Sequence, residues 1–293
     1  MSSAVPVLTR PAELSPAPVV PQPLSAEPST LSRVGKSTGR ALIRIAKPLL
    51  AIVVLLGVWE LAPRFGLVDE VFLPPFSVVV EAFLELAANG QLAEHTSASL
   101  TRSVTGFSIA LVIAVPVGIA IAWYKPVSDF LNPVLELFRN TAALALLPVF
   151  VLILGIGETS KIALIGYATF FPILLNTITG VRTVDPLLVK SAVSLGFSPL
   201  RLFQKVILPA AIPSIFTGIR MAAAGSILVL IAAEMIGARA GLGYLITAAQ
   251  QNFQIPQMYA GIVAISLIGL GFNFALVALE RRLSRWRTTP TNV

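Results

Sequence analysis

Long apolar runs separated by short polar connections dominate this chain. A bilayer core of about 30 Å needs about 20 helical residues, and six runs approach or exceed that length. They span approximately residues 48–65, 103–124, 133–154, 162–181, 209–236 and 258–279. The second run is uncharged from Ser103 to Tyr124. The pattern therefore predicts an all-α membrane protein with six transmembrane helices.

Three polar stretches interrupt or border these runs. We expect a surface helix over Ser77 to Ala88, which carries Glu81 and Glu85, and a long polar connection from Gly237 to Gln257. His95, the only histidine, precedes the second run and is expected to be a solvated loop residue.

The N-terminal segment differs in composition from the rest. Residues 1–31 contain seven prolines and no apolar periodicity, so we expect a disordered tail. Residues 32–47 carry five Lys or Arg and are expected to form a basic helix on the anionic membrane surface. The transmembrane domain is then residues 48–287, followed by a short tail, 288–293.

Composition supports a membrane protein and limits its chemistry. Hydrophobic residues make up 56% of the chain and charged residues 12%, and the mean hydropathy is +0.86. The net charge of +7 comes from Lys and Arg that flank apolar runs, so we expect no nucleic-acid partner. Without cysteine and with a single histidine, the chain offers no thiolate or multi-imidazole metal site, and we identify no catalytic constellation.

The distribution of Lys and Arg predicts the orientation. With the N-terminus inside, fifteen of the 21 basic residues lie in cytoplasmic segments, and only Arg64, Lys161 and Arg239 lie outside. This asymmetry predicts that both termini are cytoplasmic and places residues 182–209 in the cytoplasm.

Residues 182–209, here called the coupling segment, carry signals for two short helices. Asp185 and Pro186 form an N-cap and first helical position, Gly196 supplies a left-handed end, and Ser198-Pro199 starts a second helix toward Leu208-Pro209. Helices this short are marginal alone in water, so we expect the pair to dock on a protein partner outside the bilayer.

The coupling segment resembles the cytoplasmic loop of ABC importer permeases. The family pattern is Glu-Ala-Ala, three residues, Gly, nine residues, Ile-x-Leu-Pro. This chain has Lys190-Ser191-Ala192, Gly196 and Val206-Ile207-Leu208-Pro209 at the same spacing. The stretches FRNTAALALLPVFVLILGIGETSKIAL, FFPILLNTITGVR, ILPAAIPSIFTGIRMA and AAEMIGARAGLGYLI are similar to permeases for sulfonates, taurine, nitrate and bicarbonate. The resemblance covers about residues 45–287.

This resemblance implies a type I ABC importer permease fold in the bacterial plasma (inner) membrane. It implies four kinds of partner: two ATP-binding cassette subunits, a second copy of the chain, an extracytoplasmic substrate-binding protein and the lipid bilayer. ATP and Mg would bind to the partner subunits, and no cofactor is expected in this chain. The residues implied to serve the ATPase contact are Asp185, Lys190, Ser191, Ala192, Gly196, Pro199, Leu200, Arg201, Phe203, Leu208 and Pro209.

Polar residues inside or beside apolar runs are candidates for the translocation path or its gate, because a charge in the bilayer must face a partner, a cavity or water. The candidates are Arg139, Asn140, Asn176, Arg220 and Glu234. The other possible roles are a membrane anchor for Arg139, a pairing or snorkelling role for Arg220 and a structural hydrogen bond for Glu234. We expect Asn176 to form a hydrogen bond across helices.

The resemblance implies the permease subunit of an ATP-driven importer for organic sulfonates, because the wording is most similar to that of sulfonate and taurine permeases; Arg102, Arg139 and Arg220 also suit an anion. Nitrate, bicarbonate or a pyrimidine precursor of thiamine are alternative substrates. A secondary transporter would show an inverted repeat and its own ion site, and an intramembrane hydrolase would need a nucleophile and base at bilayer depth. We identify none of these features.

Overall fold

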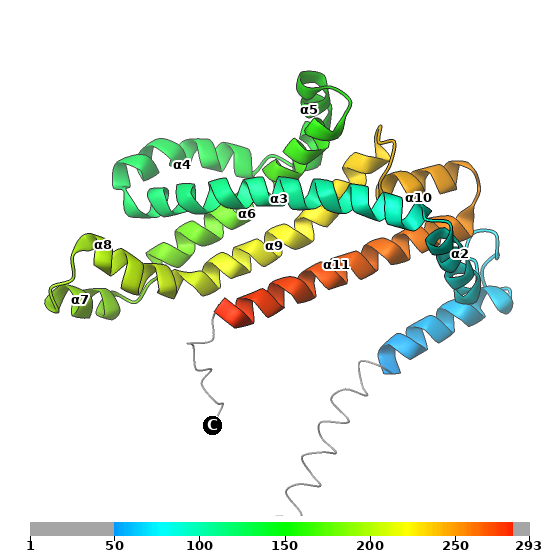
Figure 1. Ribbon diagram of the computed structural model, residues 1–293, viewed down its shortest axis with the longest axis horizontal. Coiled ribbons are helices and arrows are strands. Elements are labelled where there is room, and N and C mark those ends of the chain that lie inside the picture. Colours follow the sequence, from blue (N-terminus) through cyan, green and yellow to red (C-terminus); the bar gives the residue numbers. More distant parts are fainter. Residues whose placement is uncertain (1–49, 284–293) are drawn as a thin grey trace, which may run out of the picture. The chain divides into compact units, whose positions relative to one another are not determined.

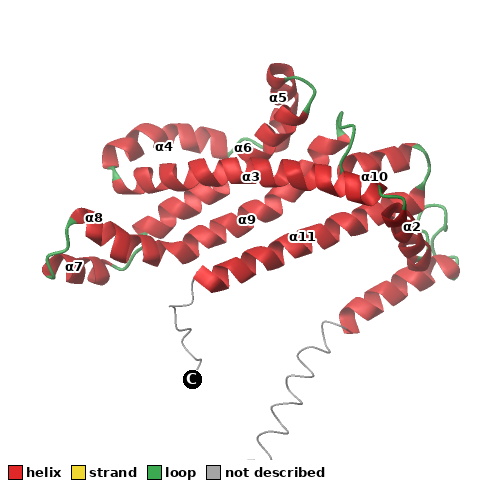
Figure 2. Cartoon of the chain, viewed as in Figure 1, coloured by secondary structure: helices red, strands yellow, loops and turns green. Residues whose placement is uncertain are grey.

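The computed structural model describes residues 50–283, so the expected tails and the basic helix at 32–47 lie outside the described residues. Residues 1–55 form one unit and residues 56–293 another. Of the first unit, residues 50–55 are described, and they are helical. All that follows concerns the second unit, in which every regular element between residues 56 and 283 is a helix (Figure 2).

The second unit begins with the rest of the first helix, which continues to residue 64. Short and long helical elements follow along the chain (Figure 1). In order they are α2 (Phe76–Ala88), α3 (Gln91–Trp123), α4 (Lys125–Arg139), the 3-10 turn η1 (Ala143–Leu146), α5 (Leu147–Leu154), α6 (Glu158–Arg182), α7 (Pro186–Ser194), α8 (Pro199–Leu202), the π-helical turn η2 (Phe203–Ile207), α9 (Leu208–Met235), α10 (Leu242–Gln251) and α11 (Ile255–Leu283). The surface helix predicted at Ser77 to Ala88 is confirmed by α2.

The main core lies between α3, α6 and α9. Its fully buried members include Ala114, Ile173, Leu174 and Ala211. Glycines let the backbones meet: a Cβ on Gly218 of α9 would lie 2.5 Å from Cβ of Asn176 on α6. Similar contacts occur at Gly106, Gly118 and Gly180. Close approach through small residues is the usual basis of helix association in lipid.

A second core joins α2, α10 and α11. Val79, Leu242 and Ala260 are buried there. The sequence prediction for residues 237–257 was incomplete, because this connection contains α10 and buries one apolar face of it. Leu245, Ile246 and Ala249 recur at helical spacing, a pattern that the polar residues around them obscured.

The third apolar run, predicted as one helix over residues 133–154, is broken. Helix α4 ends at Arg139, and the pair formed by α4 and the segment Ala143–Leu154 is bent by 87°. Pro148 does not lie at the bend: it occupies the first turn of α5, where its missing N–H and its ring fit the change from the 3-10 turn η1 to α5. Asn140 Nδ2 donates to the Glu136 carbonyl and helps to end α4.

The fifth run starts earlier than residue 209. Helix α8, η2 and α9 form one continuous helical stretch, Pro199–Met235. Pro209 removes the N–H that would bond to Lys205, and the wider π-helical turn directly before α9 accommodates the missing bond without breaking the helix. The second short helix of the coupling segment is therefore the cytoplasmic end of this longer stretch under the predicted orientation.

Four described helices are long and apolar enough to cross a membrane, and the bent pair makes up to five. The four are Gln91–Trp123, Glu158–Arg182, Pro199–Met235 and Ile255–Arg282. The first predicted run begins outside the described residues, and its described part is helical over residues 50–64.

Substitution of Gly218 by Ala is expected to destabilise the protein by about 1–3 kcal/mol, because the new methyl group would overlap Asn176 and the Pro172 carbonyl. Gly225 on the same helix is a matched control, since a Cβ at that position would have no atom within 4 Å. Gly225→Ala should leave stability unchanged or raise it by up to about 1 kcal/mol. Thermal melts of the purified protein in detergent measure both; equal melting temperatures would contradict the close contact.

Candidate functional site

The coupling segment begins with a capped helix, α7. The Asp185 carboxylate accepts a hydrogen bond from the Leu187 N–H at 2.8 Å, as predicted for an N-cap, and Pro186 occupies the first turn. Gly196 adopts φ +74°, the left-handed conformation predicted for the end of this helix. Ser198 then caps α8 through the Arg201 N–H. These local signals hold α7 and α8 at one end of α6 and α9 (Figure 1).

Apolar side chains of α7 and α8 remain unpartnered within the described residues. Leu195 is 76% exposed, and Leu187, Leu188 and Leu200 are also exposed, whereas Ala192 is buried. Lys190 and Arg201 lie exposed among them. Phe203 packs edge-on against Trp123 of α3, with ring centroids 5.3 Å apart, and Leu208 and Pro209 begin α9. The coupling segment thus combines an apolar surface with charges and is anchored on its other side.

Three of the predicted path residues line one groove. Arg139, Asn140 and Asn176 border a cavity of about 480 Å³ between the bend after α4, α6 and α9, here called the polar groove. Tyr167 also lines it and donates to the Phe138 carbonyl at 2.8 Å, which ties the end of α4 to α6. The amide of Asn176 donates to the Pro172 carbonyl of its own helix at 2.9 Å, and its contact across helices, with Met221 Sδ, is long at 3.9 Å.

Arg220 lies apart from the polar groove. Its guanidinium forms an ion pair with Glu280 on α11. It lies at a separate, largely apolar groove of about 550 Å³ between α9 and α11, which Asn273 also lines. The structure therefore does not bring Arg220 together with Arg139.

Glu234 belongs to a cluster of polar and charged side chains, here called the Arg102 cluster. Its members are Ser99, Arg102, Glu158, Lys161 and Glu234, and all of them except Glu158 are buried. Arg102 Nη1 donates to Glu234 at 2.6 Å, and its Nε and Nη2 donate to Glu158. Ser99 Oγ contacts Glu234 at 2.8 Å. The expectation that Arg102 suits an anionic substrate is wrong for this conformation, because both edges of its guanidinium are occupied by carboxylates.

The Arg102 cluster holds the connection between α9 and α10. Arg102 donates to the Ala240 carbonyl and Lys161 to the Gly237 carbonyl, while the Gly243 N–H donates to Glu234. A Cβ on Gly241, where φ is +123°, would fall on the Glu234 carboxyl group. The backbone of this connection is therefore fixed by side chains of α3, α6 and α9.

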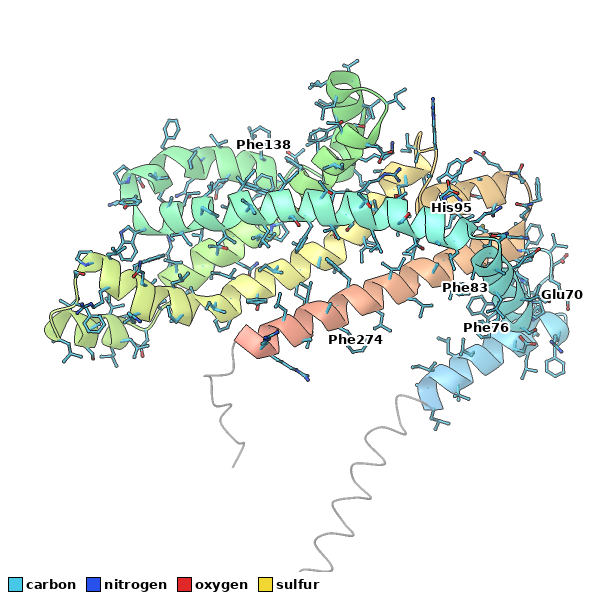
Figure 3. All side chains as sticks on the ribbon, viewed as in Figure 1. Glu70, Phe76, Phe83, His95, Phe138 and Phe274 are labelled. Atoms are coloured by element: carbon cyan, nitrogen blue, oxygen red, sulfur yellow. The ribbon has the colours of Figure 1, made fainter. Side chains whose placement is uncertain are left out.

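Two sequence predictions at this end of the helices are corrected. His95 is not a solvated loop residue: it is buried within α3, and its Nδ1 accepts from the Gly241 N–H at 3.2 Å (Figure 3). Lys161, predicted in an outer loop, is 3% exposed within α6. Both helices extend beyond the apolar runs, because paired polar residues prolong them where hydropathy alone ends.

No group of three or more His, Cys, Asp or Glu side chains suited to a metal occurs within residues 50–283.

Replacement of Glu234 by Ala is expected to cost about 3–5 kcal/mol of stability, because it leaves Arg102 half unpaired and the Gly243 N–H without its partner in a buried site. Glu85→Ala on the exposed face of α2 is the control and should change stability by less than about 0.5 kcal/mol. Melting temperatures in detergent are the measurement. A Glu234→Ala protein as stable as the control would refute a structural role for the ion pair.

Comparison with known proteins adds the family. The model of the family described as "Binding-protein-dependent transport system inner membrane component" matches residues 114–286. Taurine transport system permease protein TauC of Escherichia coli (strain K12) is 38% identical over 240 residues, covering 80% of this chain and 87% of that protein. Putative aliphatic sulfonates transport permease protein SsuC of Bacillus subtilis (strain 168) is 35% identical over 256 residues, covering 87% and 93%.

A solved structure supports the fold. A crystal form of the MetNI methionine ABC transporter, described as inward facing, aligns with a TM-score of 0.56 at 18% identity, covering 67% of this chain and 98% of that chain. This likeness supports the expected type I ABC importer permease fold. Because the family model covers more than half of the chain and both relatives exceed 30% identity over most of it, the chain belongs to the family of binding-protein-dependent transport system inner membrane components and is a multi-pass permease subunit of an ABC importer, not itself an enzyme.

Proposed function

We propose that this permease carries organic sulfonates, of the alkanesulfonate or taurine type, into the cell. The observation that supports a transport role most directly is the exposed apolar helix pair α7–α8. This pair connects α6 to α9 in the sequence, and α6 and α9 pack tightly against each other. The names of the relatives, a taurine permease and an aliphatic sulfonates permease, support the substrate class.

The proposed topology has six transmembrane helices with both termini in the cytoplasm. The four long apolar helices and the bent pair supply five of them, and the helix that includes residues 50–64 supplies the first. The excess of Lys and Arg on one side supports this orientation. It places α7 and α8 where soluble ATP-binding subunits have access.

The proposed mechanism uses the coupling segment as a handle. Two ATP-binding subunits each receive one α7–α8 pair, and their ATP-driven closure displaces α6 and α9, which alternately open the path inward and outward. A two-fold motor fits a homodimer of this chain, with the path along the dimer axis. Nucleotide then shifts the population between two states of the permease, and a soluble binding protein delivers the substrate from outside.

The polar groove is the proposed path for the substrate. Arg139 is exposed, lines this groove, and forms no ion pair within residues 50–283. Its guanidinium therefore offers donors in the geometry that a sulfonate oxygen pair accepts, and Asn140 and Asn176 add amide donors on the same groove. Arg220 pairs with Glu280, and Glu234 pairs with Arg102. These two residues are proposed to influence the conformation of the permease.

Gly196→Pro is expected to abolish ATP-driven uptake, because proline requires a φ near −65° and position 196 has a φ of +74°. Insertion into the membrane should be normal. Gly66 is a matched control: it has φ +70°, is exposed, and lies outside the coupling segment. Co-purification of the ATP-binding subunit and uptake into proteoliposomes are the measurements.

Two outcomes of this experiment are informative. Loss of ATPase binding in Gly196→Pro with full uptake in Gly66→Pro supports the handle. Normal uptake and coupling in Gly196→Pro contradict it, and uptake that follows an ion gradient without ATP in the unmodified protein contradicts the importer itself.

Arg139→Gln is expected to lower taurine uptake about 10-fold or more, because a charge-assisted bond to the sulfonate contributes about 1.5–3 kcal/mol. Binding-protein-stimulated ATP hydrolysis should persist, since the coupling segment is unchanged. Arg64→Gln, at the end of the first helix, is the control for loss of one positive charge.

The substrate itself is tested on the binding protein. Calorimetric titration with taurine, an alkanesulfonate, nitrate and bicarbonate should give tight binding for a sulfonate. Tight binding of nitrate or bicarbonate with none for sulfonates would overturn the proposed substrate class and leave the importer assignment intact.

A further inference from the structure

The two carboxylates that bind Arg102 differ in their access to water. The side chain of Glu234 is 0% exposed and that of Arg102 is 4% exposed, whereas the side chain of Glu158 is 60% exposed. Arg102 therefore joins one carboxylate that is sealed in the protein and one that lies at its surface.

The Glu234 side of the Arg102 cluster is held by many contacts. Its carboxylate accepts hydrogen bonds from Ser99 Oγ, Arg102 Nη1 and the Gly243 N–H. Loss of any of these bonds would leave a buried polar group unpaired, which is costly. We therefore expect Arg102 and Glu234 to hold α3 and α9 together when the Glu158 bond opens.

The Glu158 side is held by Arg102 alone among the hydrogen bonds of the described residues. Glu158 is the first residue of α6, and glycines at 155 and 157 precede it. Gly155 has φ +82°, and a Cβ at either glycine would have no atom within 4 Å, so no close packing surrounds these two residues. When Glu158 leaves Arg102, water solvates the Glu158 carboxylate, which is already 60% exposed; the cost of separation falls on Arg102, whose Nε and Nη2 lose their partner while Nη1 keeps Glu234.

The position of Glu158 connects this bond to the coupling segment. Helix α6 runs from Glu158 to Arg182, directly before α7, and α9 runs from directly after η2 to the residues beside Glu234. Their backbones are in contact at Gly180 and Gly218, so displacement at the coupling segment is transmitted along both helices to the Arg102 cluster.

We propose that the Arg102–Glu158 ion pair is a releasable lock, closed in this conformation and opened in each transport cycle, while Arg102–Glu234 stays closed. This inference rests on the proposed function and adds a point of regulation at the end of α6 opposite the coupling segment. Arg102 is then a positioning residue that holds α6 in the resting state until nucleotide displaces it.

The test is Glu158→Gln in the complete transporter, reconstituted with its ATP-binding subunits and binding protein. Glutamine keeps the shape and removes the charge. Weakening this ion pair, which is exposed on the Glu158 side and buried on the Arg102 side, should shift the equilibrium out of the resting state by about two- to fivefold. The expected result is therefore a rise of about two- to fivefold in ATP hydrolysis without binding protein, at an unchanged melting temperature.

Glu94→Gln is the matched control, since Glu94 is an exposed carboxylate in the first turn of α3 that forms no ion pair within residues 50–283. It should hydrolyse ATP as the unmodified protein does. A purely structural role of Glu158 would instead lower the melting temperature and reduce basal and stimulated hydrolysis together. Glu158→Gln with the same basal hydrolysis as Glu94→Gln would overturn the lock.

A second experiment uses a disulfide bond to hold the start of α6 against the connection between α9 and α10. Cγ2 of Ile156 lies 3.4 Å from the position that a Cβ on Gly237 would occupy, so the side chains of cysteines at these two positions would be adjacent, and the chain has no other cysteine. Oxidised Ile156→Cys/Gly237→Cys transporter should lose ATP-driven taurine uptake and regain it on reduction. Equal uptake before and after complete cross-linking would overturn the proposal.

Failure of the lock differs from failure of the proposed function. If the chain is not an importer permease, the unmodified protein binds no ATP-binding subunit and shows no ATP-driven uptake. If only the lock is wrong, the unmodified transporter works normally and Glu158→Gln and the cross-linked variant behave as it does.

Discussion

The contact of α6 with α3 on one side and α9 on the other is the interaction on which the rest of the structure depends. Lipid tails are as apolar as leucine, so helices in a bilayer gain little by leaving lipid and must instead gain from dense packing. Glycines at 106, 118, 180 and 218 allow that density, because a methyl group at each would overlap the neighbouring helix. Helix α6 therefore moves together with α3 and α9, unless its contact with one of them opens.

The burial of each charged group determines where a contact between these helices can open. An unpaired charge in the apolar layer is expensive, so Arg102 and Glu234 remain together once packing has enclosed them. Glu158 belongs to the same cluster but reaches water, and its bond is therefore the weak one. The asymmetry follows from position alone: Glu158 starts a helix at the surface, and Glu234 lies within one.

The sequence predicted local features well and distant pairings poorly. Caps and backbone signals such as Asp185 and Gly196 act within a few residues, so their pattern was sufficient to predict α7 and its end. The break after Arg139 was missed because hydropathy does not record where the backbone bends. The partnership of Arg102 with Glu158 and Glu234 joins residues more than fifty positions apart, and one sequence has no signal for it except charges beside the ends of apolar runs.

Exposed apolar residues mean different things along this chain. On α5, Leu152 and Ile153 are exposed in an uncharged stretch, and lipid is sufficient to cover them. On α7 and α8, Leu195 and Leu200 are equally exposed, but Lys190 and Arg201 lie beside them and exclude the hydrocarbon layer. Apolar surface that lipid does not cover requires a protein partner, and the exposed apolar residues of α7 and α8 therefore support the proposal that ATP-binding subunits dock on the coupling segment.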